Sequence, residues 1–163
     1  MTTETLIKVS NEPAAKLSRL AEVAKIISSS CRWAAAAGAI PLPLLDVVAL
    51  AAVQASMVNR IAGQYGETIS DEAAESVVAV LLGSIIPSGL ASAAVGTGIK
   101  LIPGVGYVAG AVAFGGLGAA ATYAVGKIFV RHFEGGGTVA TFNPAAVQND
   151  LKAEFAAAKA GKA

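Results

Sequence analysis

Charged residues are scarce in this chain, since they fill 14% of its 163 positions, whereas soluble domains carry roughly 25%. Aromatic residues account for only 6%, so the hydrophobic 55% of the sequence is mainly small and aliphatic. Small residues suit helices that pack closely in lipid better than they suit the bulky core of a water-soluble domain. The composition therefore favours a membrane protein, and the alternative is a soluble bundle that buries its most apolar helices.

Other scarcities exclude whole classes of protein. The single cysteine, Cys31, excludes an internal disulfide framework, and the single histidine, His132, excludes a metal site built from several histidines. A net charge of +1 gives no electrostatic sign of nucleic-acid binding. The polar N-terminus lacks the apolar segment of a cleavable signal peptide, so a membrane-bound chain would use its first span as the insertion signal.

Nucleotide-binding motifs are missing as well. Near Lys127 the phosphate-loop pattern fails twice, because Ala121 stands where it needs glycine and Ile128 where it needs Ser or Thr. The glycines of residues 104–110 miss the dinucleotide-binding spacing. We therefore expect no enzyme, and hence no catalytic residue, no cofactor and no metal.

Uncharged sequence is what the chain has in quantity. Residues 76–99 and residues 101–126 contain no charged side chain, and only Lys100 separates them. About 20 apolar residues in a helix cross the roughly 30 Å hydrocarbon core of a bilayer. With Pro103 and Gly104 as the turn, this pattern predicts a transmembrane helical hairpin over residues 76–131.

Small residues recur every fourth position along the second arm of that hairpin. Such ridges let helix backbones approach closely, and GxxxG is the simplest form of the pattern. We expect the helix-packing positions to be Gly106, Gly110, Gly115 and Gly118.

Residues typical of membrane–water interfaces flank these segments. Trp33 follows Arg32 ahead of an apolar stretch, and the second arm ends at Lys127 and Arg131. We expect Trp33, Lys127 and Arg131 to lie at the interface. The positive-inside rule then puts both termini in the cytoplasm and Lys100 outside, in a bacterial inner membrane.

The N-terminal third is expected to be disordered or extended over residues 1–10 and helical after Ser10 or Asn11, with Pro13 in the first turn. The apolar face of this helix either lies on anionic lipid or packs on the other helices. Pro41 and Pro43 predict a break, followed by a helix over residues 43–64 that is partly embedded or packed on the hairpin. Asp46, near its start, is a candidate ion or proton site.

The remaining segments are connections and one more helix. Four acidic residues and no basic one lie within positions 67–75, and Pro87 predicts a kink or a split in the helix that follows. Residues 11–134 are expected to form the membrane-associated domain, followed by a linker over 135–142 with a short extended piece at 138–142. A helix over 143–163, capped by Asn143, is either docked or semi-free.

Four segments resemble a known bacterial family. They are residues 40–46 (IPLPLLD), 57–66 (MVNRIAGQYG), 102–106 (IPGVG) and 119–126 (AAATYAVG). Over residues 20–134 the chain is similar to the YcjF-like domain of unknown function (family 697), which is often fused to Era-like GTPases. The resemblance implies a helical, membrane-associated module without assigned chemistry. This chain has no G domain, so a GTPase enters only as an optional partner in trans.

Together these patterns predict an all-α, membrane-associated helical bundle around a glycine-rich hairpin. Its expected role is non-enzymatic, either self-association as a homo-oligomer or recruitment of a partner to the lipid bilayer. A channel or transporter subunit is the alternative, with Asp46, Gln54 or the Pro87 break lining a wet path. A soluble helical oligomer that buries its apolar hairpin is the other.

Overall fold

The computed structural model describes residues 3–38, 45–99 and 105–162, with side chains described for 12–38, 48–85 and 108–162. Every regular element in these ranges is helical, which confirms the predicted all-α class. The elements are α1 (Thr3–Ala37), α2 (Leu45–Gln64), α3 (Asp71–Ile99), α4 (Val105–Glu134), the short 3-10 helix η1 (Val139–Thr141) and α5 (Gln148–Lys159).

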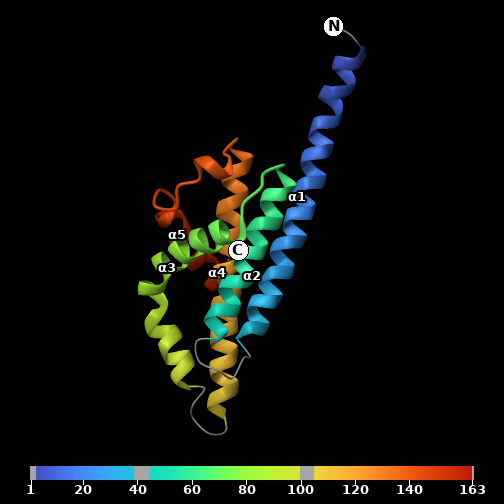
Figure 1. Ribbon diagram of the computed structural model, residues 1–163. Helices are drawn as coiled ribbons and strands as arrows, with labels where there is room; N and C mark the ends of the chain where they lie inside the picture. Colours follow the sequence, from blue (N-terminus) through green and yellow to red (C-terminus); the bar gives the residue numbers. More distant parts are fainter. Residues whose placement is uncertain (1–2, 39–44, 100–104, 163) are drawn as a thin grey trace.

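Helix α4 is the centre of the bundle, because each of the other four α-helices packs against it. Figure 1 shows α1, α2 and α4 running along one another, with α5 and α3 on the opposite side from α1. The N-terminal part of α1 projects beyond the bundle at one end, and α4 extends past α1 and α2 at the other (Figure 1). The N-terminus of α1 and the C-terminus of α4 therefore lie at the same end.

The core is made by apolar residues at helical spacing on α2, α3 and α4. Met57, Val58 and Ile61 of α2 are fully buried, as are Val78 and Leu81 of α3. They meet Val125 and Phe129 on α4. Burial of this kind stabilises a bundle by about 25 cal/mol for each Å² of apolar surface removed from water.

Helix α1 begins earlier than the sequence suggested. It is helical from Thr3, so residues 3–10 are not the extended segment that we expected, and Pro13 lies inside the helix instead of in its first turn. No glycine or proline precedes Pro13, so nothing in residues 3–12 ends a helix. A proline in a helix removes one backbone hydrogen bond, and at the exposed position of Pro13 water can take its place.

Helix α3 differs from a straight hairpin arm. It is continuous from Asp71 to Ile99, so Pro87 does not split it into two helices. Figure 1 shows that its first part crosses the bundle and that its later part turns toward the end of the bundle where α4 begins. The contacts of the predicted hairpin lie outside the described residues, because they involve the side chains from residue 86 onward together with Lys100, Pro103 and Gly104.

The C-terminal region is docked on the bundle. Leu151 and Phe155 of α5 are buried in the core, and α5 packs on α3 and α4. The predicted extended piece is instead the turn of η1, because the Thr138 amide donates to Thr141 Oγ1 at 2.9 Å. Asn143 Oδ1 accepts the Ala145 amide at 3.0 Å and so caps the turn that precedes α5.

Candidate functional site

The seam between α1 and α4 brings two helix backbones together without side chains between them. A Cβ atom added at Gly38 would stand 2.5 Å from the Gly115 nitrogen, and one added at Gly115 would stand 2.7 Å from the Ala35 oxygen. Further along, a Cβ at Gly118 would meet the Ala34 oxygen at 3.2 Å. The glycine face of α4 therefore lies against α1 of the same chain.

The same seam continues toward the polar end of the bundle. A Cβ at Gly126 would come within 2.8 Å of Ile27 Cγ1, and the Cys31 thiol donates to the Ala119 carbonyl at 3.5 Å. Burial raises the pKa of the Cys31 thiol. The thiol therefore stays neutral, and Cys31 acts as a small apolar residue here. The residue pairs along the seam show that α1 and α4 are antiparallel.

A buried polar pair joins α2 to α4. Gln54 and Thr122 are both fully buried, and Gln54 Nε2 donates to Thr122 Oγ1 at 3.2 Å. Thr122 Oγ1 in turn donates to the Gly118 carbonyl at 2.8 Å. Gln54 Oε1 has no hydrogen-bond partner among the described residues. The pair fixes the register of α2 against α4, because either group left alone in this core would be costly.

Glu134, the last residue of α4, ties three helices together at the polar end. Its carboxylate accepts Lys16 Nζ at 2.9 Å and Arg19 Nη2 at 3.2 Å, both from α1. It also accepts a hydrogen bond at 2.9 Å from the hydroxyl of Tyr65, the residue that directly follows α2. The Arg19 guanidinium lies 4.8 Å from the centre of the Tyr65 ring, which stacks on Phe133. We call Lys16, Arg19, Tyr65 and Glu134 the clasp.

The charges in the clasp shift the proton affinities of its members. The hydrogen bond from Lys16, together with those from Tyr65 and Arg19, lowers the pKa of Glu134. Burial, and next the hydrogen bond to Glu134, raises the pKa of Tyr65 to about 12. The clasp was missed in the sequence, where Glu134 stands directly before three glycines and looks like the start of a linker. Its one signal is the basic pair Lys16 and Arg19, spaced by three on one helix face.

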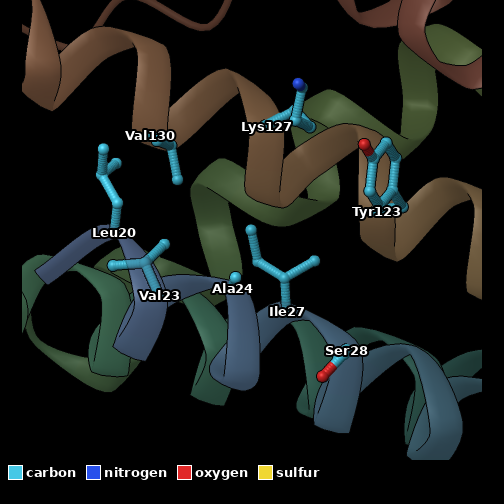
Figure 2. Close-up of a pocket in the computed structure, with 8 residues that line it drawn as sticks. All are labelled: Leu20, Val23, Ala24, Ile27, Ser28, Tyr123, Lys127 and Val130. Atoms are coloured by element: carbon cyan, nitrogen blue, oxygen red, sulfur yellow. The ribbon is translucent and has the colours of Figure 1, made fainter. Parts of the chain in front are cut away.

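An open apolar groove of about 240 Å³ lies between α1 and α4. Figure 2 shows the side chains of both helices that border it. They are Leu20, Val23, Ala24, Ile27, Ser28, Tyr123, Lys127 and Val130. Lys127 sits at the rim with its ammonium 5.9 Å from the Tyr123 ring centre. Val23, Ile26 and Ile27 are buried, so α1 packs on the bundle, while Leu17 and Ala24 remain exposed.

The opposite end of the bundle exposes apolar side chains. Trp33 on α1, Val48 on α2, and Val108 and Val112 on α4 are each between 62% and 71% exposed. No charged residue occurs in residues 33–38, 48–59 or 108–126. Helix α4 from Val108 to Glu134 is long and apolar enough to cross a membrane, and half of its most apolar stretch is buried in the bundle. A buried helix of a soluble protein has the same character.

The predicted interface residues occupy different surroundings. Trp33 and Lys127 are exposed. Arg131 instead forms ion pairs with Asp150 at 3.2 Å and with Glu154, both belonging to α5. Gly110 is buried on α4, while the surroundings of Gly106 and the side chain of Asp46 are outside the described residues. Among the residues that are described, no three His, Cys, Asp or Glu side chains gather as a metal site.

Comparison with known proteins identifies the family of this bundle. The family described as domain of unknown function DUF697 matches residues 8–158. The chain belongs to the DUF697 family. This confirms the resemblance found in the sequence, and the match is wider than residues 20–134 because it includes most of α5. The clasp, the seam and the docked α5 therefore all lie within the DUF697 domain.

A curated relative carries a descriptive name. "Magnetosome membrane protein 22" of Magnetospirillum gryphiswaldense is 35% identical over 127 residues. The alignment covers 78% of this DUF697 chain and 65% of the relative, so the chain spans about two thirds of that protein's length. No solved structure matches the chain.

Proposed function

We propose that this DUF697 protein is a non-enzymatic, membrane-embedded module whose apolar end enters the bilayer. The observation that carries the proposal is the separation of charge along the bundle. The clasp and the ion pairs of Arg131 occupy one end, while Trp33, Val48, Val108 and Val112 are exposed at the other. Isolated exposed apolar residues are normal on soluble proteins, but several exposed apolar residues gathered at one end of three helices mark an interaction surface.

Two further points support a bilayer as the partner of this surface. The related magnetosome protein is named as a membrane protein. Residues 105–126 carry no charge and rise about 33 Å as a helix, which matches the roughly 30 Å hydrocarbon core. The clasp lies where the N-terminal half of α1 meets the C-terminal end of α4. The positive-inside rule therefore puts the clasp on the cytoplasmic face of a bacterial inner membrane.

At the membrane we favour recruitment of a partner over self-association through glycines. Gly115 and Gly118 lie against α1, so these positions are already occupied within one chain. The polar end, with the projecting start of α1 (Figure 1), is the surface that remains for a protein partner in the cytoplasm. The fusion of similar domains to Era-like GTPases makes a GTPase in trans the partner to test first. The channel alternative has no support from Gln54, because its amide is buried against Thr122.

The test is extraction of membranes with alkaline carbonate, which removes peripheral proteins and leaves embedded ones. We expect the wild-type chain to stay in the membrane pellet. A lysine in the middle of a membrane helix costs about 2.5–3.5 kcal/mol, so Val112→Lys combined with Gly116→Lys, two exposed positions near the middle of residues 105–126, should move most of the protein to the supernatant. Leu17→Lys is the matched control. Leu17 is 69% exposed, and it lies between the clasp residues Lys16 and Arg19, at the polar end of the bundle. Release of the wild-type chain by carbonate would contradict embedding.

A further inference from the structure

The contacts of α4 fix the depth of α1 and α2 relative to it. Along α1, Ile27 lies beside Gly126, Ala34 beside Gly118 and Gly38 beside Gly115. Along α2, Gln54 bonds to Thr122 and Leu50 lies 3.4 Å from the Cβ position of Gly118. Helix α1 therefore descends along α4 as far as Gly115, and α2 ascends from about the same level. Figure 1 shows the same relation, with α4 extending well past both.

Gly115 is near the middle of the charge-free part of α4. It lies about 15 Å from Val105 and about 17 Å from Gly126 at the rise of an α-helix. If residues 105–126 cross the bilayer, as the proposed function holds, then α1 ends and α2 begins close to the bilayer midplane. Neither α1 nor α2 extends far enough along α4 to reach the opposite face of the bilayer.

We infer that the end of α1 from Trp33 and the first half of α2 form a re-entrant hairpin: both helices lie beside α4 in one half of the bilayer, and neither passes its midplane. This inference rests on the proposed function and adds the manner in which the chain contacts lipid. The surface that meets the acyl chains includes Trp33 and Val48, which are 67% and 62% exposed. The occupant of this surface is the interior of a bilayer, and a shallow insertion of the bundle tip is the competing arrangement.

Two charges work against this placement, and both are tolerable. Arg32 is exposed on α1, one turn above the level of Ala35, and its long side chain can reach toward the headgroups while its stem stays in lipid. Asp46 falls in the first turn of α2. A carboxylate there costs about 2.5–3.5 kcal/mol on insertion scales. The clasp, the seam and the core keep α2 against α4 in spite of that cost.

Depth measurement separates the re-entrant hairpin from a tip insertion. In a Cys31→Ser background, single cysteines replace Val48, Val112 or Val108 and carry a fluorescent label. The proteins are reconstituted in vesicles of phosphatidylcholine and phosphatidylglycerol with lipids that carry a quencher at graded depths. A re-entrant hairpin makes the label at position 48 the deepest, and places the label at 108 near the far headgroups. A tip insertion makes the label at 108 the deepest and the label at 48 shallower.

Three outcomes can be told apart. Deepest quenching at position 48, with position 108 reached by an impermeant thiol reagent from the side opposite Lys127, supports the inference. Deepest quenching at position 108 overturns it and leaves the proposed function intact. If the labels at all three positions are quenched by aqueous iodide and by none of the lipid quenchers, both the inference and the proposed function are overturned.

A measurement on the wild-type chain guards against misfolding of the labelled variants. Trp33 is the single tryptophan, so its own fluorescence reports depth without any substitution. We expect quenching by brominated lipids to be strongest for bromines between the headgroups and the midplane. Strongest quenching by headgroup-level or aqueous quenchers would place Trp33 outside the hydrocarbon core and overturn the re-entrant hairpin.

Discussion

Gly38, just after the end of α1, lies backbone to backbone against Gly115 in the N-terminal half of α4. A side chain on either residue would collide with main-chain atoms of the other helix, which cannot rotate away as a side chain can. The glycine ridge of α4 is therefore complementary to a second small-residue segment, residues 34–38, within the same chain. Such contacts gain dispersion energy between closely spaced backbones.

The first prediction compares two neighbouring glycines. Gly115→Ala would place a methyl group 2.7 Å from the Ala35 oxygen, whereas a Cβ at Gly116 meets nothing within 4 Å. We expect Gly115→Ala to lower the free energy of unfolding by about 1–3 kcal/mol, as overpacking does. Gly116→Ala should be neutral or stabilising by up to about 1 kcal/mol, because alanine is the better helix former. Thermal unfolding in detergent compares the two, and equal melting temperatures would show that α1 does not hold this close contact.

The second prediction concerns the buried pair on α2 and α4. Thr122→Val removes the acceptor of the Gln54 amide and leaves that amide without a partner in the core. An unsatisfied buried group costs about 1–3 kcal/mol, and we expect a loss of stability in that range. The double variant Gln54→Leu with Thr122→Val should recover part of the loss, because both polar groups are then absent. Chemical denaturation of the four proteins of this cycle measures the coupling, and strictly additive effects would mean that the two residues act independently.

The helices of this fold follow from the sequence, and the contacts between them do not. Proline at 41 and 43 predicted the break between α1 and α2, since proline restricts the backbone locally. Asparagine at 143 instead caps a turn, and the last helix begins at Gln148, five residues later than predicted. The run of small residues on α4 predicted a surface for close packing. It did not identify α1 as the helix packed against Gly115, because any small-residue segment of this chain or of another copy would satisfy the same pattern.

The polar end was the part that sequence reasoning could not foresee. Lys16 and Glu134 are far apart in the sequence, so only the fold brings them to 2.9 Å. Arg131 suggested a lipid anchor because basic residues at the end of an apolar helix are common at interfaces. Its pairing with Asp150 and Glu154 depends on how α5 docks, which the local pattern of α4 does not contain.

The third prediction tests what holds α5 in place. Leu151 is fully buried, and Leu151→Ala should cost about 2–5 kcal/mol, as for other leucine truncations in cores. The ion pairs of Arg131 are exposed, and exposed pairs contribute about 0–1 kcal/mol, so Arg131→Ala should change stability little. Limited proteolysis after α4 is the readout. Rapid loss of α5 in the Arg131 variant, with α5 still protected in the Leu151 variant, would reverse this assignment.

The fourth prediction concerns the pH dependence of the clasp. The pKa of Glu134 is lower in the folded chain than in an unfolded one, because its ionised form accepts hydrogen bonds from Lys16, Tyr65 and Arg19. Its contribution to stability is therefore complete above the unfolded pKa of about 4.3 and is lost as the pH falls through the folded value. Glu134→Gln keeps the size of the side chain and cannot ionise, so it should lose less stability than the wild type over that range.

Melting temperatures of both proteins, measured in detergent from neutral pH down to below about pH 4, provide the comparison. The other carboxylates titrate in both proteins, so the difference between the two curves isolates Glu134. We expect the curves to be furthest apart near neutral pH, where the wild type is more stable, and to converge as the solution is acidified. Parallel curves would mean that Glu134 has the same pKa in the folded and unfolded chains, and that α1 is held to α4 by the seam alone.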